Sequence, residues 1–217
     1  MKTAYIDFDG TIVDVMPRYH GILTSYLKGT LKICLESFCN LKRQGLKEHQ
    51  IVEIYDPTYP FYIPDYVEFK RERLESMEWL ALDRVIGDPI LAHEQLNLAG
   101  FNVHLLTQRR NEKNVSAQLK QLGLWGAFDE VSVVAPMING NAKASFLKGK
   151  VTPEDIVVGD SPVDMECARL LGITGFFVET GLWCEPDEAN VRILPNYNAV
   201  ASLMVMGYGK RERYSDF

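Results

Sequence analysis

Acidic side chains follow two apolar segments of this 217-residue sequence. Asp7 and Asp9, separated by one residue, stand at the end of the first segment. Asp160 and Asp164 follow the second. Carboxylates that lie close together repel one another, and burying them without a partner is costly. A hard divalent cation such as Mg²⁺ removes this conflict, because it prefers oxygen ligands and is held by carboxylates together with substrate phosphate. If the fold brings the four residues together, they predict a metal site that receives a phosphate group.

Two further polar residues could contact such a phosphate group. Thr107 follows the apolar segment 102–106, and Lys143 lies in the first turn of a helix predicted to begin at Asn141. A lysine ammonium group offsets the charge of a phosphate dianion, and a threonine hydroxyl can donate a hydrogen bond to it. Thr107 and Lys143 are therefore the candidate phosphate-binding residues. On spacing alone, an ordinary exposed lysine is the simpler interpretation of Lys143.

The elements that must position these side chains alternate between strand and helix. The sequence predicts five apolar strands, at residues 4–8, 102–106, 130–134, 155–158 and 174–178. Helices are predicted at residues 111–122 and 161–171. Such alternation is typical of right-handed βαβ units and predicts an α/β fold, a doubly wound parallel sheet with helices on both faces. Functional groups in such sheets gather outside the carboxyl ends of the strands, so all the candidate side chains are expected at one edge.

Residues 15–87 have a different pattern, which predicts an all-helical insertion between the first two strands. Leucines recur every four residues, the spacing of one helix face, at Leu23, Leu27, Leu31 and Leu35. A second helical pattern spans residues 67–80, and the segment 55–64 between them has three prolines and is unsuited to a helix. We therefore predict two domains, an α/β core of residues 1–14 and 88–217 and a small all-helical domain of residues 15–87.

The motifs and their order resemble those of the haloacid dehalogenase superfamily. The matching stretches are Asp7-Phe8-Asp9-Gly10-Thr11, Thr107 after an apolar strand, Lys143, and Gly159-Asp160 followed by Asp164. The resemblance covers essentially the whole chain. The helical insertion is similar to the C1-type cap of phosphoglycolate-phosphatase-like and β-phosphoglucomutase-like members. The resemblance therefore implies a capped hydrolase with a Rossmann-like core.

The resemblance also implies a role for each matching residue. Asp7 would attack phosphorus and form an aspartyl-phosphate, and Asp9 would protonate the leaving oxygen and later activate water. Thr107 and Lys143 would hold the phosphoryl oxygens. The implied ligands of Mg²⁺ are Asp7, the backbone carbonyl of Asp9, Asp160 and, directly or indirectly, Asp164. Dehalogenases of the family lack an acid at the position of Asp9, so its presence favours phosphoryl chemistry.

Asp164 also has a structural explanation. Ser161, Pro162 and Asp164 match an N-cap, a proline at the first helical position and an acid at the third. The capping role and the metal role are compatible.

Residues beside the matched motifs are candidates for substrate specificity: Arg18, Tyr19, His20, Gln108 and Arg109. The first three follow the first motif, where hinge and substrate meet in similar proteins, and the other two follow Thr107. The aromatic and proline-rich segment 55–66 is a further candidate, although a packed loop is the simpler interpretation of that segment.

These features predict a Mg²⁺-dependent phosphatase that hydrolyses a small phosphorylated metabolite. One alternative is a phosphomutase of the β-phosphoglucomutase type, because the choice between water and a second hydroxyl as acceptor depends on contacts that the sequence does not specify. Another is a non-catalytic domain that binds a phosphorylated ligand. A signalling receiver module is disfavoured, since its phosphorylated acid follows the third strand.

Composition limits the partners and the location. A net charge of −6 without a basic stripe argues against nucleic acid as a partner. No apolar stretch approaches the roughly 20 residues that a membrane span needs. Four cysteines without a CxxC pair predict reduced thiols: Cys34, Cys39, Cys167 and Cys184. We therefore expect a cytoplasmic monomer or homodimer that acts on a small phosphorylated substrate.

Overall fold

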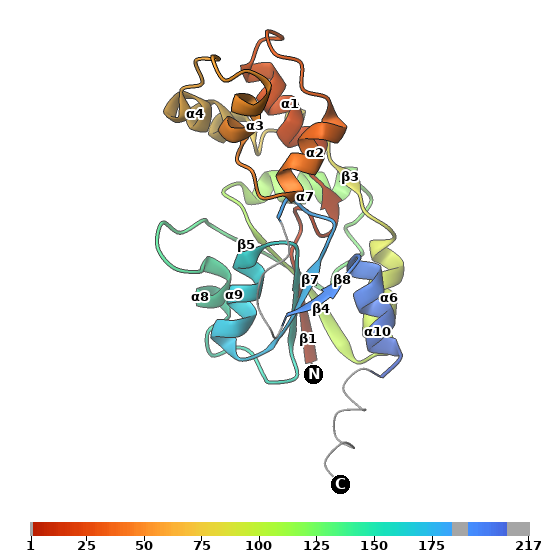
Figure 1. The fold of residues 1–217 in the computed structure, drawn as a ribbon. Coiled ribbons are helices and arrows are strands. Elements are labelled where there is room, and N and C mark those ends of the chain that lie inside the picture. The colour runs from red at the N-terminus through yellow and green to blue at the C-terminus, as the bar shows by residue number, and fades with distance from the viewer. Residues whose placement is uncertain (1, 184–190, 208–217) are drawn as a thin grey trace.

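A computed structural model of the protein describes residues 2–183 and 191–207 (Figure 1). Its main sheet has six strands in the order β5-β4-β1-β6-β7-β8. In chain order these strands are β1 (Lys2–Ile6), β4 (Phe101–Gln108), β5 (Glu130–Val134), β6 (Ile156–Gly159), β7 (Thr174–Val178) and β8 (Arg192–Leu194). Every neighbouring pair of strands in this sheet runs parallel. The predicted α/β fold with a parallel sheet is therefore confirmed.

Helices cover both faces of the main sheet (Figure 1). One face packs against α6 (Pro89–Leu98), α7 (Glu112–Gln121) and α10 (Tyr197–Val205), and the other against α8 (Ala142–Leu147) and α9 (Pro162–Leu171). Successive side chains of a strand point to opposite faces, so Ile6 of β1 belongs to the first apolar cluster and Tyr5 to the second. Burial on both faces explains why these strands are almost continuously apolar.

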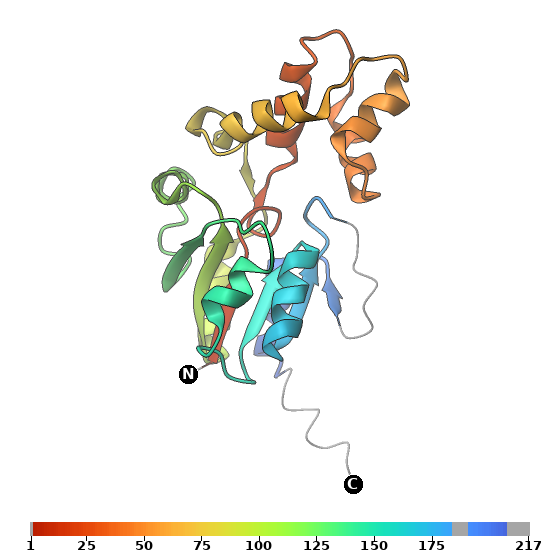
Figure 2. The same ribbon diagram turned by 90° about the vertical axis from the view of Figure 1, so that its left-hand side faces the viewer.

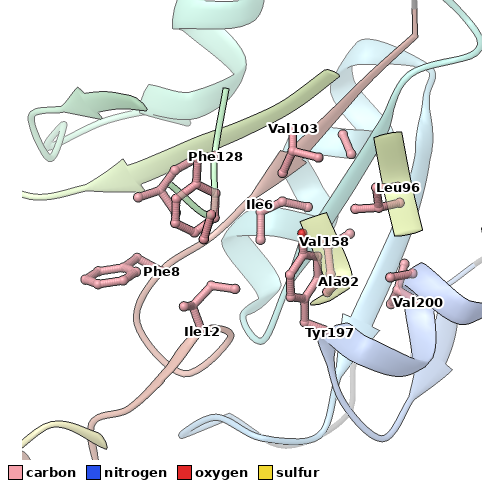
Figure 3. Packing of buried hydrophobic residues seen from close by; sticks show 14 of the residues in the cluster. Ile6, Phe8, Ile12, Ala92, Leu96, Val103, Phe128, Val158, Tyr197 and Val200 are labelled. Carbon is pink, nitrogen blue, oxygen red and sulfur yellow. The ribbon is translucent and has the colours of Figure 1, made fainter. Parts of the chain in front are cut away.

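The larger apolar cluster holds the three central strands against the helices (Figure 3). Ile6, Val103 and Val158 come from β1, β4 and β6, and all three side chains are completely buried. They belong to one cluster with residues of α6 and α10, including Ala92, Leu96, Tyr197 and Val200. Because close packing leaves little freedom, the residues that follow these strands have fixed positions relative to one another.

Five helices form the helical layer, which lies at the end of the main sheet toward which β1 runs (Figures 1 and 2). They are α1 (Met16–Tyr26), α2 (Leu35–Arg43), α3 (Glu48–Tyr55), α4 (Ile63–Arg73) and α5 (Met77–Leu80). The chain enters this layer through β2 (Val13–Asp14) and leaves it through β3 (Arg84–Val85), and these two strands pair antiparallel. The layer has an apolar cluster of its own, which includes Leu23, Phe38 and Ile51. The predicted domain borders fall at the end of β2 and just beyond β3.

The four leucines of the helical pattern do not lie on one continuous helix. α1 ends at Tyr26, and Lys28 and Gly29 adopt left-handed backbone angles, with φ of 51° and 73°. Such angles cannot continue a right-handed helix, so a turn follows and α2 begins only at Leu35. The second predicted helix is also interrupted, between Arg73 of α4 and Met77 of α5.

The helices of the described ranges are short. α1 and α4 have 11 residues each. Within residues 2–183 and 191–207, no helix combines the length and the apolar character that crossing a membrane requires.

The cysteines that fall in the described ranges carry free thiols. Cys34 is exposed on the helical layer, Cys39 is half-buried there, and Cys167 is buried on α9. Cys184, the fourth cysteine, lies outside the described residues.

Candidate active site

The central strands bring Asp7 next to Asp160. β1 lies between β4 and β6, and Ile6 pairs with Leu105 on one side and Val158 on the other. The backbone N–H of Asp7 continues this ladder by donating to the carbonyl of Val158 at 2.9 Å. Asp7 and Asp160 are the residues that leave these two strands, so the sheet register itself sets their separation.

Four side chains form what we call the Asp7 cluster: Asp7, Lys143, Asp160 and Asp164. The ammonium group of Lys143 lies 2.5 Å from Oδ1 of Asp7 and 2.5 Å from Oδ1 of Asp164. One oxygen from each of the three carboxylates lies within 4.8 Å of the others, a grouping that could hold a metal ion. Sequence reasoning predicted all four residues, and the structure brings them together.

Charge in the Asp7 cluster is unbalanced. Burial, only partly offset by Lys143 and reinforced by Asp164, raises the pKa of Asp7 to about 7. Burial and the neighbouring Asp7 raise the pKa of Asp160 well above its usual range. Three ionised carboxylates facing one ammonium group leave two negative charges in excess, and a divalent cation would offset them. Carboxylate oxygens are also the ligands that Mg²⁺ prefers, so this group fits the predicted metal.

Asn141 fixes Lys143 in place. It is the N-cap of α8, and its side-chain oxygen accepts a hydrogen bond from the N–H of Ala144 at 2.9 Å. Its side-chain amide donates to the carbonyl of Val163 at 2.7 Å, which ties α8 to α9. The side chain of Lys143 is 5% exposed, so its ammonium group has little alternative to the carboxylates around it.

Asp164 performs the predicted capping role and contacts Lys143 at the same time. Its Oδ2 accepts from the hydroxyl of Ser161 at 2.5 Å, and its backbone N–H donates to that hydroxyl oxygen at 3.4 Å. Its Oδ1 faces Lys143. The two carboxylate oxygens therefore serve the start of α9 and the Asp7 cluster separately.

A loop after β7, which the sequence analysis did not single out, supports Asp160. The N–H of Leu182 donates to Oδ2 of Asp160 at 3.2 Å, and the hydroxyl of Thr180 donates to the carbonyl of Gly10 at 2.6 Å. A Cβ on Gly181 would overlap the carboxylate of Asp160, and so would one on Gly10, whose φ is +79°. Both glycines therefore allow the backbone to approach Asp160 closely. Gly181 lies just beyond the last predicted strand, and this glycine was the one sign in the sequence of a close approach of the backbone to another residue there.

Asp9 lies in a different environment from Asp7. Arg109 donates to it through Nε, at 2.9 Å, and through Nη2. Arg18 donates from Nη2 to Oδ1 at 2.8 Å. Burial alone would raise the pKa of Asp9, but the two guanidinium groups outweigh it and hold the pKa at about 2. The side-chain carboxylate of Asp9 is accordingly not part of the group around Asp7, and only its backbone carbonyl stays a predicted ligand.

The two arginines belong to a closed ring, the Asp9 network, made of Asp9, Arg18, Asp83, Arg109 and Gln118. Nε of Arg18 lies 3.0 Å from Oδ1 of Asp83. Gln118 closes the ring, since its amide donates to Oδ2 of Asp83 at 2.7 Å and its oxygen accepts from Arg109 at 3.2 Å. The network joins the helical layer, which supplies Arg18, to α7, which supplies Gln118. Asp83 and Gln118 were not predicted.

The other residues predicted to bind phosphate or to determine specificity lie at the end of β4, between the sheet and the helical layer, or inside the helical layer. Thr107 is buried near the carboxyl end of β4, and Gln108 is the half-buried last residue of that strand. Tyr19 packs against the apolar clusters of both the sheet and the helical layer. Nε2 of His20 lies 2.7 Å from the carbonyl oxygen of Ile33, inside the helical layer. The structure therefore does not bring His20 to the Asp7 cluster.

Comparison with known proteins gives evidence at the level of the fold. No protein-family model matches the chain. No curated protein matches its sequence.

A haloacid dehalogenase-like hydrolase from Streptococcus pneumoniae is similar in structure, with a TM-score of 0.65, 17% identity and coverage of 93% of this chain and 97% of its own. A protein from Thermotoga maritima provisionally named β-phosphoglucomutase has a TM-score of 0.64, 17% identity and coverage of 95% and 100%. A predicted phosphoglycolate phosphatase from Haemophilus somnus has a TM-score of 0.63, 18% identity and coverage of 94% and 97%. The chain therefore has the fold of haloacid dehalogenase-like hydrolases, which confirms the predicted resemblance at the level of the fold.

Proposed function

We propose that this protein is a Mg²⁺-dependent phosphatase that hydrolyses a small phosphorylated metabolite through an aspartyl-phosphate. The observation that carries the proposal is the Asp7 cluster, where three buried carboxylates from the ends of β1 and β6 and the start of α9 lie together and two of them pair with the ammonium group of Lys143. A phosphate monoester and a divalent cation bring the charges that this arrangement lacks. The similarity to structures described as phosphatases supports the same reaction class.

Asp7 is the proposed nucleophile. One of its carboxylate oxygens forms a bond to phosphorus while the bond from phosphorus to the ester oxygen breaks, and the alcohol leaves. Water then attacks the phosphorus of the aspartyl-phosphate and releases inorganic phosphate. Lys143, 2.5 Å from Asp7, stabilises negative charge on the phosphoryl oxygens, and Thr107 at the end of β4 donates to them.

Asp7, Asp160, Asp164 and the backbone carbonyl of Asp9 would hold Mg²⁺. When bound, the cation would lower the pKa of Asp7 from about 7 and supply positive charge to the phosphoryl oxygens.

Asp9 is the proposed acid and base for the leaving oxygen and for water. A carboxyl group paired with two guanidinium groups is a poor proton donor, so this role requires Asp9 to separate from at least one arginine when substrate binds. Arg18 belongs to α1 of the helical layer, whereas Asp9 follows β1. We therefore propose that residues 15–87 act as a lid whose movement changes the Arg18–Asp9 contact and excludes water.

A phosphomutase is the second candidate. The same groups could pass the phosphoryl group from Asp7 to a second hydroxyl instead of water. The similarity to the Thermotoga maritima protein named for that reaction favours this alternative over others.

Phosphate release from a panel of small phosphomonoesters, with and without Mg²⁺, tests the proposal. The wild-type protein is expected to release phosphate only with the cation, and Asp7→Asn to release at least about a thousandfold less. Asp65→Asn, an exposed acid on α4, is the matched control and should behave as wild type. Equal release by wild type and Asp7→Asn on every ester would contradict the proposal. Conversion of a sugar phosphate to its isomer without phosphate release would select the mutase.

A further inference from the structure

β5 forms one edge of the main sheet (Figure 2). Within residues 2–183 and 191–207 the only strand that pairs with it is β4. Val131 of β5 is 38% exposed, whereas β4 beside it is buried along most of its length. The outer side of β5 is therefore open to solvent.

The backbone groups of Val131 and Val133 point toward this open side. The N–H of Arg109 donates to the carbonyl of Val134 at 3.0 Å, so the backbone groups of Val134 face β4. Successive residues of a strand direct their N–H and C=O groups to alternate sides. Val131 and Val133 therefore each offer one donor and one acceptor to a further strand.

β5 lacks the features that usually protect the edge of a sheet. Edge strands in natural proteins commonly carry lysine, proline or a bulge, or are covered by another element. The sequence of β5 is Glu-Val-Ser-Val-Val, and it keeps one register with β4 over all five residues. A regular strand with a single charge, on Glu130, is a suitable template for pairing with another chain.

Exposed apolar side chains stand in the two loops that adjoin β5. Trp125, in the loop before the strand, is 55% exposed. Met137 and Ile138, in the loop after it, are 50% and 100% exposed. Single exposed apolar side chains are common, but these three flank the same open edge. The β5 surface, as we call it, comprises Trp125, Val131, Val133, Met137 and Ile138.

A second copy of the chain fits this edge when the two β5 strands run antiparallel, as a twofold axis perpendicular to the sheet requires. With the axis at Ser132, Val131 of each copy lies opposite Val133 of the second copy. Both residues then pair through their outward backbone groups. Glu130 lies opposite the uncharged Val134, so no like charges meet across the axis.

The two loops complement each other in the same arrangement. In an antiparallel pair the amino end of one strand lies beside the carboxyl end of the other, so Trp125 of each copy comes beside Met137 and Ile138 of the second copy. The interface thereby covers apolar surface at both ends of the strand pair. The carboxyl edges of the two sheets point in opposite directions, so the two Asp7 clusters face away from each other.

We propose that the β5 surface joins two copies of this chain into a homodimer with one sheet continuous across both copies. This inference does not depend on the phosphatase reaction. The competing explanation is that Met137 and Ile138 pack against the helical layer of their own chain when that layer moves, and that β5 stays unpaired.

Sedimentation equilibrium of the full chain tests the proposal. Wild type is expected to be a dimer at about 100 µM and to dissociate on dilution toward about 1 µM. Val131→Lys puts an ammonium group beside the axis and should weaken dimerisation at least about tenfold. Val131→Ile keeps the side chain apolar and should dimerise within about threefold of wild type. A wild-type monomer at the highest concentration would overturn the proposal.

Two variants in the loops separate the proposal from its competitor. Trp125→Ala and Ile138→Ser should each weaken dimerisation about fivefold or more. Leu98→Lys, which changes an 83% exposed leucine on α6, is the control and should dimerise as wild type. If Val131→Lys, Trp125→Ala and Ile138→Ser all dimerised as wild type, the interface would lie elsewhere and the proposal would fail.

Ser132→Cys tests the register directly. The axis places this residue opposite itself in a pair without backbone hydrogen bonds, where the two Cα atoms lie about 4.5 Å apart and a disulfide can form. After oxidation with copper phenanthroline, mass spectrometry should find two copies joined through the introduced thiol. The same treatment of Ser132→Cys combined with Val131→Lys should give at least about tenfold less of this product. A dimer without this crosslink would contradict the arrangement.

Discussion

Asp7 and Asp9 stand two residues apart, yet the structure gives their carboxylates opposite electrostatic surroundings. In the Asp7 cluster three carboxylates lie together and Lys143 forms ion pairs with two of them, Asp7 and Asp164, and the pKa of Asp7 rises to about 7. In the Asp9 network two carboxylates face two guanidinium groups, and the pKa of Asp9 falls to about 2. Burial acts in the same direction on both residues, so the difference comes from their partners.

The difference separates a cluster in which carboxylates outnumber cationic side chains from a network in which two carboxylates face two guanidinium groups. Charges buried without enough partners destabilise a fold, and a chain retains them where a ligand restores the balance. We therefore propose the Asp7 cluster as the place for the cation and the phosphate. The Asp9 network joins the helical layer to α7 and to the end of β1 in the conformation that the structure shows.

Removing Lys143 should produce the largest effect, because it worsens an imbalance that already exists. Lys143→Met leaves three buried carboxylates with no cationic side chain and is expected to lower the free energy of unfolding, measured without Mg²⁺ near neutral pH, by about 3 to 5 kcal/mol. Phosphate release should be lost as well. Lys148→Met, an exposed lysine in the same segment, is the control. If Lys143→Met had the same free energy of unfolding as Lys148→Met, the charges of the Asp7 cluster would be balanced without Lys143, which would contradict the account.

Breaking the Asp9 network should cost less, because Arg109 keeps its contacts with Asp9. Arg18→Met is expected to lower the free energy of unfolding by about 2 to 3 kcal/mol. Mg²⁺ affinity, measured by calorimetry, should stay within about threefold of wild type, since Arg18 contacts no member of the Asp7 cluster.

The control for this variant is Arg71→Met, which removes an arginine that is 55% exposed. A large loss of Mg²⁺ affinity in Arg18→Met would show that the two clusters act as one.

Gly181→Ala tests the close approach of the loop after β7 to Asp160. The added Cβ would overlap the carboxylate of Asp160 and displace it, so Mg²⁺ should bind about tenfold more weakly with little change in folding. Gly126→Ala, where a Cβ meets nothing within 4 Å, should bind Mg²⁺ as wild type does. Unchanged affinity in Gly181→Ala would argue against Asp160 as a ligand.

The smallest expected effect is a pH dependence of the Mg²⁺ contribution to stability. Because the pKa of Asp7 is raised from 3.8 to about 7, the folded protein keeps protons that the unfolded chain has lost. The stability from this protonated form is complete at acid pH and is lost as the pH rises through 7. Mg²⁺ competes with those protons, so the increase in Tm on adding Mg²⁺ should be larger at about pH 8 than at about pH 5.5.

A shift of the same size at both values would contradict the raised pKa. The matched measurement is Asp7→Asn, where the pH dependence of the Mg²⁺ effect should be reduced because Asp7 no longer titrates.

The sequence predicted the Asp7 cluster because each member has a local signal. Asp7 and Asp160 end apolar strands, and Asn141 and Ser161 cap the helices that carry Lys143 and Asp164. Parallel strands joined by βαβ connections then place the carboxyl ends of these strands, and so these residues, at one edge of the sheet.

The Asp9 network could not be predicted in the same way. Asp83 and Gln118 are 35 residues apart, and each looks like an ordinary polar residue until its partner is known. Gln118 stands between apolar positions of α7, where only the structure shows that it reaches Asp83 and Arg109. The regular spacing of four leucines does not mark one helix, because Leu23, Leu27 and Leu31 join the apolar cluster of the helical layer although α1 ends at Tyr26, and Leu35 begins α2 and is exposed.

The most direct test of the account is to find which residue receives the phosphoryl group. Rapid quenching during turnover with an active ester, followed by mass spectrometry of the peptides, should locate one phosphoryl group on Asp7, in the presence of Mg²⁺ and not in its absence. Asp9, two residues away but held by Arg18 and Arg109, should carry none. Phosphorylation of Asp9 or of any other residue, or release of phosphate at the full rate from Asp7→Asn, would contradict the account.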